Sequence, residues 1–249
     1  MNTPQPAVAR VSGLATVVDI IVSPSAAFAR LRETPTWGWA FLIGTVLGII
    51  GTFLIAPAVS HVLDVTLPAK FAASPQIAAL PPSQQQSTIA LQLKISHIVV
   101  AFLWVFVPIG ILVGGLIQGL IMLVANAIGG GGGSFKKYFA LSVNVSVVGY
   151  GLATVVLGLI VTIRGAGSFE ASNSVYEAMP SLALLAPGAK GFMAGCLAGV
   201  NIFTLWATAL IALGVQQIGR VRVGAAWGAA IVTLLLYALY LGANAAQNA

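Results

Sequence analysis

The feature that most constrains this chain is a series of long apolar stretches. A bilayer core takes about 20 helical residues to cross, and an apolar run of that length is a strong indication of a membrane span. Five runs qualify, covering residues 37–59, 95–128, 141–163, 191–216 and 224–241. We therefore expect an all-α integral membrane protein, a bundle of about five transmembrane helices within residues 37–243.

The composition excludes the common soluble classes. The chain is 59% hydrophobic and 6% charged, whereas an ordinary soluble domain carries about 25% charged residues. The net charge of +6 does not indicate nucleic-acid binding, because the basic residues are scattered between apolar runs and form no patch. The single cysteine, Cys196, excludes an intrachain disulfide and a cysteine-based metal site.

The segment before the first span, residues 1–36, is expected to form a short cytoplasmic collar. One helix lying in the membrane interface should end at Ser23-Pro24, and a second short helix should carry Phe28. The A-x-A sequence Ala27–Ala29 keeps a cleaved signal peptide as the alternative, which Asp19 disfavours by interrupting the apolar stretch.

The distribution of basic residues predicts the orientation. With a cytoplasmic N-terminus, the inner segments hold seven of the 11 Lys and Arg residues. They include two basic turns, formed by Lys136, Lys137, Arg220 and Arg222. The positive-inside rule then places the C-terminal tail, residues 244–249, outside. The alanine-rich, lysine-poor composition favours a bacterial source, and hence the inner (cytoplasmic) membrane.

Irregular features are expected in the second span and in the two outer loops. The second span is longer than a bilayer requires, and Pro108 is its expected kink point. The loop 60–94 contains several prolines, so its first part should be irregular, with helix over Thr88–Lys94. In the loop 164–190, the apolar piece Leu182–Ala186 is expected to form a short surface helix.

Few residues in this sequence favour catalysis. Ionisable groups at membrane depth usually mark pumps and intramembrane enzymes, and here they lie at span ends or in loops. His61 and His97 lack the partners of a metal site. The run Gly129–Gly133 follows an apolar helix and lacks the Lys of a phosphate loop, so it indicates a helix stop and hinge. We expect no enzymatic activity, no cofactor and no metal.

Small residues at four-residue spacing recur along the spans. In lipid, such stripes allow two helix backbones to approach closely. The longest series, Gly191, Gly195 and Gly199, is the candidate groove, either for a partner or for packing within the chain. Shorter pairs are Gly44 and Gly48, Gly110 and Gly114, Gly115 and Gly119, and Gly224 and Gly228.

Uncharged polar residues at membrane depth form a second candidate site. The candidate cluster comprises Asn126, Asn144, Tyr150 and Asn201. A polar group in lipid costs free energy unless it is paired, so hydrogen bonding between helices is the first interpretation. A path for a solute is the alternative.

Three segments carry a resemblance to a known family. They are Val22–Trp37; Gly132–Val156, with a Ser-Phe-Lys turn and a Gly-Tyr pair; and Val200–Trp227, with the pattern Asn-x-Phe-x-x-Trp. In order and spacing they resemble bacterial members of the Yip-domain family, multi-span membrane proteins named for interaction with Ypt and Rab GTPases. The family often has a proline shortly after Gly-Tyr, where this chain has Thr154.

The resemblance implies a protein without enzymatic activity that acts as an interaction or membrane-organising scaffold. Its partners would be the bilayer and a protein, or a second copy, bound through the small-residue helix faces. Rab binding is not implied, because the short N-terminal region lacks the extended tail that eukaryotic members use. A transporter or channel for a small solute is the alternative function.

Overall fold

The fold is a bundle of membrane-length helices. The computed structural model describes residues 13–171 and 174–247, and all regular elements in these ranges are helical. Five segments are long and apolar enough to cross a membrane: Gly38–Ala72, Pro82–Ile128, Phe135–Arg164, Ile202–Gly219 and Val223–Gln247. The expected all-α membrane fold with five spans is confirmed.

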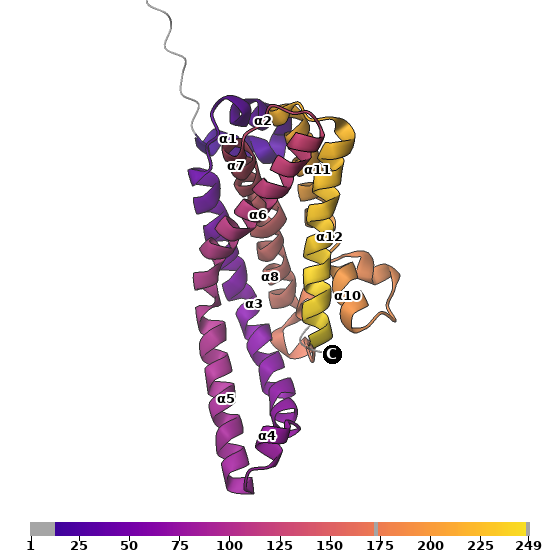
Figure 1. Cartoon of the computed structure of the whole chain (residues 1–249). Coiled ribbons are helices and arrows are strands. Elements are labelled where there is room, and N and C mark those ends of the chain that lie inside the picture. Colours follow the sequence, from indigo (N-terminus) through magenta and orange to yellow (C-terminus); the bar gives the residue numbers. More distant parts are fainter. Residues whose placement is uncertain (1–12, 172–173, 248–249) are drawn as a thin grey trace, which may run out of the picture.

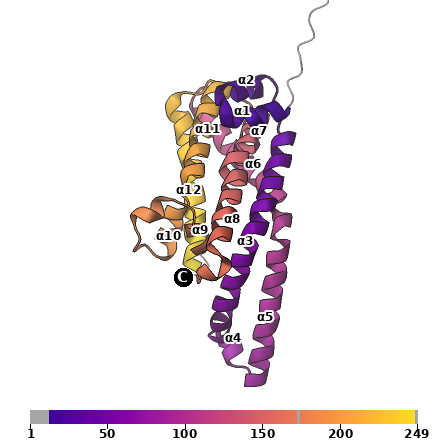
Figure 2. The same cartoon turned by 180° about the vertical axis from the view of Figure 1, so that it is seen from behind.

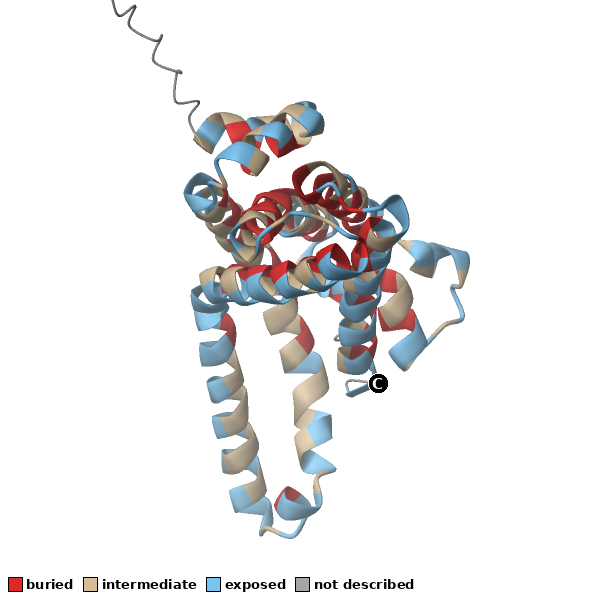
Figure 3. Ribbon diagram, turned by 45° about the horizontal axis from the view of Figure 1, so that its top comes forward, coloured by how far each residue is buried: buried red, intermediate tan, exposed pale blue. Residues whose placement is uncertain are grey.

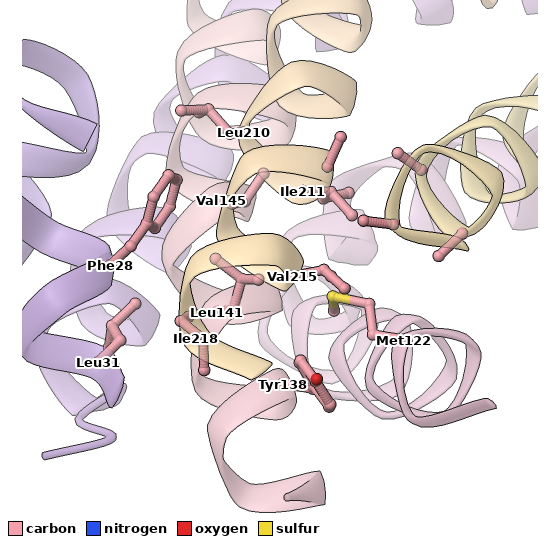
Figure 4. Packing of buried hydrophobic residues seen from close by; sticks show 14 of the residues in the cluster. Phe28, Leu31, Met122, Tyr138, Leu141, Val145, Leu210, Ile211, Val215 and Ile218 are labelled. Atoms are coloured by element: carbon pink, nitrogen blue, oxygen red, sulfur yellow. The ribbon is translucent and has the colours of Figure 1, made fainter. Parts of the chain in front are cut away.

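Two short helices lie across one end of the bundle, which we call the N-terminal face (Figure 1). They are α1 (Gly13–Val22) and α2 (Pro24–Glu33), and Asp19 of α1 forms an ion pair with Arg30 of α2. Phe28 and Leu31 of α2 are fully buried and point toward the central helices (Figure 4). The two expected N-terminal helices are present, divided at the expected Ser23-Pro24.

The third span is the centre of the bundle. It consists of α7 (Phe135–Ser146), a π-helical segment (Val147–Leu152) and α8 (Ala153–Arg164). Residues 140–145 are all buried, because α3 (Gly38–Ala72), α6 (Phe106–Ile128) and α11 (Ile202–Gly219) pack around them. The widened turn contains the Gly-Tyr pair and forms without the family's usual proline.

The second span bends where it was expected to bend. It runs through α5 (Pro82–Phe102), a 3₁₀ turn (Leu103–Val105) and α6, and the chain changes direction there (Figure 1). Pro108 has no N–H to donate to the carbonyl of Trp104, and its ring crowds the preceding turn. The altered turn therefore lies just before the proline.

The expectation of an irregular outer loop is wrong. Helix α3 continues for 35 residues through Pro57 and Pro68, a length of about 52 Å. A short α4 (Pro75–Ala78) connects it to α5. Pro75 and Pro82 start these helices, where the missing N–H costs no hydrogen bond. The resulting hairpin extends beyond the other spans (Figure 2), and few of its residues are buried (Figure 3).

The expectation of one continuous helix over 191–216 is also wrong. The chain forms α10 (Gly191–Ala198), breaks at residues 199–201 and continues as α11. Before α10, the loop 164–190 contains α9 (Ser174–Glu177) and a 3₁₀ turn (Leu182–Leu185), which lies where the short surface helix was expected. The last span, α12 (Val223–Gln247), packs against α6, α10 and α11.

Candidate functional site: a tyrosine-lined cavity beside a broken helix

The break in the fourth span is held by its own hydrogen bonds. Asn201 caps α11, because its Oδ1 accepts from the backbone N–H of Phe203 (3.0 Å) and of Thr204 (3.1 Å). The Thr204 hydroxyl accepts from the Asn201 N–H (2.9 Å) and donates to the Gly199 carbonyl (2.9 Å). The loop 164–190 adds a bond from the Leu182 N–H to the Val200 carbonyl (3.0 Å). Irregular backbone is tolerated at membrane depth when it is paired in this way.

A cavity of about 290 Å³ lies beside this break. Its walls come from five parts of the fold: α3, the bend between α5 and α6, the π-helical segment with α8, the region 176–201, and α12. Its polar lining consists of Thr52, Tyr150, Thr154, Tyr176, Asn201 and Tyr237. Most of the remaining lining is aliphatic or aromatic, so the cavity is an apolar space with a few polar groups.

Tyrosines gather at this cavity. The chain has five tyrosines, and four of them, Tyr150, Tyr176, Tyr237 and Tyr240, lie close enough to interact electrostatically. All but Tyr240 line the cavity. Desolvation and the neighbouring Tyr240 raise the pKa of Tyr176 above its ordinary value. A tyrosine hydroxyl is protonated at neutral pH even at an ordinary pKa of about 10. The cluster therefore presents uncharged hydroxyl groups.

The polar lining groups differ in their capacity to donate. The hydroxyls of Thr52 and Thr154 already donate to the carbonyls of Gly48 (2.8 Å) and Tyr150 (2.6 Å). Asn201 is only 9% exposed, and its Nδ2 has no acceptor among the described residues. No described lining residue carries a formal charge at neutral pH. The site thus suits a neutral molecule that brings hydrogen-bond acceptors.

The predicted polar cluster is divided between two places. Only Tyr150 and Asn201 line the cavity. Asn126 lies toward the N-terminal face, where its Oδ1 accepts from Gly133 N–H (2.8 Å) and the Tyr138 hydroxyl (2.7 Å). Asn144 donates from Nδ2 to the carbonyls of Thr36 (2.9 Å) and Ala140 (2.8 Å). Through these hydrogen bonds, the two asparagines connect turns and helices within the chain.

The predicted glycine groove is filled by the chain itself. A Cβ added at Gly195 would lie 2.5 Å from the Leu241 carbonyl oxygen and 2.9 Å from Gly242 Cα. A Cβ at Gly199 would lie 2.8 Å from Ala238 Cα. Gly191 begins α10 with a positive φ of 51°. Of the two alternatives for this series, packing within the chain is the one observed, with α12 as the neighbouring helix.

Other glycine pairs do face outward. A Cβ added at Gly110 or Gly114 of α6 would meet nothing within 4 Å. The same holds for Gly224 and Gly228 of α12. These two pairs leave room for the backbone of a further helix, in contrast to the pairs on α3 and α10.

The two basic turns lie on the N-terminal face beside the glycine run. Lys136, Arg220 and Arg222 are exposed and Lys137 is half-buried. The two loops are joined by bonds from Gly132 N–H to the Gly219 carbonyl (2.8 Å) and from Arg222 N–H to the Gly129 carbonyl (3.3 Å). The glycine run ends α6, as expected, but it forms a packed turn and not a free hinge.

Comparison with known proteins agrees with this architecture. The family model described as the Yip1 domain matches residues 18–243. The chain belongs to the Yip1 domain family. Membrane protein YknW of Bacillus subtilis (strain 168) is 27% identical over 243 residues, which cover 93% of each chain. No solved structure matches. The family assignment made from the three segments is confirmed.

Sequence reasoning missed most of the residues that line the cavity of this Yip1 domain protein. Tyr176 lies in an outer loop, and Tyr237 resembles an ordinary lipid-facing aromatic residue on α12. Thr52 is one hydroxyl among many in α3. The one usable signal was Asn201 followed by Thr204. Residues of these types at this spacing typically cap the start of a helix, and here they stand inside an apolar stretch.

Proposed function

We propose that this Yip1 domain protein is a non-enzymatic, membrane-organising interaction protein of a bacterial inner membrane. It binds a protein partner, or a second copy of itself, through an outward helix face. The observation that carries the proposal is the pair Gly224 and Gly228, at which an added Cβ would meet no atom within 4 Å. In lipid, two backbones that approach at such residues gain dispersion contacts.

The internal packing of α12 supports this use of its outer face. Near the C-terminal end of α12, Gly242 faces α10, where an added Cβ would lie 2.9 Å from the Phe192 carbonyl oxygen. Closer to the N-terminal end of α12, the same face carries Gly224 and Gly228 together with the exposed Ile231 and Leu235. One face of α12 is thus covered by α10 near the C-terminal end of the helix and left open at Gly224 and Gly228.

The charge distribution supports a cytoplasmic N-terminus and an outer C-terminus. In the described residues, the N-terminal face carries six basic side chains: Arg30, Arg32, Lys136, Lys137, Arg220 and Arg222. The opposite end carries four: Lys70, Lys94, Arg164 and Lys190. The excess on the N-terminal face favours the cytoplasm for that face.

The transport alternative has less support. It drew on polar residues at membrane depth, and these are divided between the cavity and the N-terminal face. Asn126 and Asn144 hydrogen-bond to the backbone of their own chain, as expected of residues that hold a bundle together.

The test is crosslinking of the tagged protein in membranes of its native host. The double variant Gly224→Leu with Gly228→Leu should insert normally and lose at least 80% of the crosslinked species, roughly the effect of 1 kcal/mol. The control is Ala243→Leu, which also introduces a leucine at an exposed position elsewhere on α12. Unchanged crosslinking in the double variant would contradict the proposal.

A further inference from the structure

We propose that the tyrosine-lined cavity is a binding site for an uncharged glycerolipid such as diacylglycerol. An acyl chain lies against the apolar wall, and the ester or hydroxyl oxygen of the lipid accepts hydrogen bonds from Tyr237 and Asn201. The proposal goes beyond the protein–protein interaction above and depends on different residues.

The cavity is accessible from the bilayer. Phe106, at the bend of the second span, is 61% exposed, and Tyr237 on α12 is 44% exposed. Both line the cavity, Phe106 from the bend of the second span and Tyr237 from α12. In a membrane their exposed surface meets lipid, so a lipid chain enters the cavity without crossing water.

The lining chemistry selects a neutral molecule with acceptor atoms. Tyr150, Tyr176 and Tyr237 supply hydroxyl groups, and Asn201 supplies an amide N–H pair that no described residue accepts from. An amide donor that no side chain or backbone carbonyl accepts from is free to donate to a ligand carbonyl in the cavity. A phosphate group would find no Lys or Arg among the described lining residues, so phospholipid headgroups are disfavoured.

Two neighbouring cavities offer space for lipid chains. The cavity of about 290 Å³ lies at the small end of known ligand sites, which start near ~300 Å³. A second cavity of about 420 Å³ lies between α3 and α5 and shares Thr52 and Ala56 with the first. Its wall includes Phe53, Pro57 and Trp104. A diacyl lipid can therefore place part of one chain in each cavity.

The experiment uses the purified full-length protein in phospholipid nanodiscs and a diacylglycerol with a photoreactive diazirine in one acyl chain. Labelling should be saturable, should decrease when unlabelled dioleoylglycerol is added, and should fall on peptides containing residues 149–157 and 237–241. A phosphatidylcholine probe with the same photoreactive chain should label without saturation. Equal saturable labelling by the two probes would overturn the choice of a neutral lipid.

Two variants test the donors without removing structural groups. Tyr237→Phe deletes one hydroxyl, and Asn201→Ser keeps an oxygen to cap α11 while deleting the amide donor. Each should weaken competition by dioleoylglycerol about fivefold, the effect of one hydrogen bond. The control Tyr240→Phe alters a tyrosine that does not line the cavity and should leave competition unchanged. Unaltered competition in both donor variants would refute the site.

A cavity-filling variant covers the case in which the donor changes disturb folding. Ala153 lines the cavity, and Ala153→Phe should abolish saturable labelling while the far-ultraviolet circular dichroism spectrum remains helical. Saturable labelling retained in this variant would place the lipid elsewhere and overturn the proposal. None of these residues lies on the Gly224 face, so failure here leaves the crosslinking result unaffected.

Discussion

The close contact between α3 and α8 depends on Gly51, and replacing that glycine by alanine tests the packing directly. A Cβ at position 51 would lie 2.6 Å from the backbone carbonyl carbon of Thr154 and 2.7 Å from its oxygen. Ordinary contact begins near 3.4 Å, so the added carbon is about 0.8 Å too close to backbone. A backbone group cannot rotate away, and the two helices must separate.

The expected magnitude follows from two opposing terms. Overpacking of this kind costs about 1–3 kcal/mol. Alanine is a better helix former than glycine by about 0.8–1 kcal/mol. The net change for Gly51→Ala should therefore range from near zero to about 2 kcal/mol of lost stability.

The control is the same substitution on the same helix at Gly44. There an added Cβ would meet Ile111 Cδ1 at 3.5 Å, an ordinary contact with the end of a flexible side chain. Gly44→Ala should keep the propensity gain, so the two variants should differ by about 1–3 kcal/mol. The assay is unfolding in mixed micelles with increasing sodium dodecyl sulfate, followed by far-ultraviolet circular dichroism. Equal unfolding midpoints for the two variants would refute the packing argument.

Two further predictions concern the N-terminal face and the orientation. Asn126→Ala removes the acceptor of two buried donors, Gly133 N–H and the Tyr138 hydroxyl, and should cost about 2–6 kcal/mol of stability. Tyr138→Phe should cost only about 1 kcal/mol. Equal losses of stability in the same micelle assay would contradict the shared-acceptor geometry. The orientation is tested with single cysteines in a chain whose Cys196 is replaced. Gln76→Cys should react with a membrane-impermeant maleimide in intact cells, and Ser134→Cys should not, since both positions are exposed but lie at opposite ends of the bundle. The reverse pattern would overturn the proposed orientation.

Much of the fold could be predicted because its causes are local. A run of apolar residues long enough for the bilayer becomes a helix, since lipid offers no other partner for the backbone. The second span bends at Pro108 because a missing N–H acts within one turn. The division of the N-terminal helices at Ser23-Pro24 has the same local origin. These features depend on neighbours along the chain.

The outer hairpin shows where local rules misled. Prolines in the loop 60–94 indicated irregular chain, yet Pro75 and Pro82 start helices and Pro68 lies within α3. A proline at the first helical turn costs nothing, and one inside a membrane helix is tolerated when its surroundings compensate. Composition alone does not distinguish these cases.

The sequence by itself determined the class of protein, its five spans, its N-terminal helices and its family, because each depends on residues close together in the chain. Only the tertiary structure decided which glycines pack internally, since Gly195 and Gly228 stand in similar apolar surroundings along the chain. It also assembled the cavity, in which Tyr150 and Tyr237 come from different spans. Contacts between helices depend on how the spans are arranged, and no local pattern encodes that arrangement.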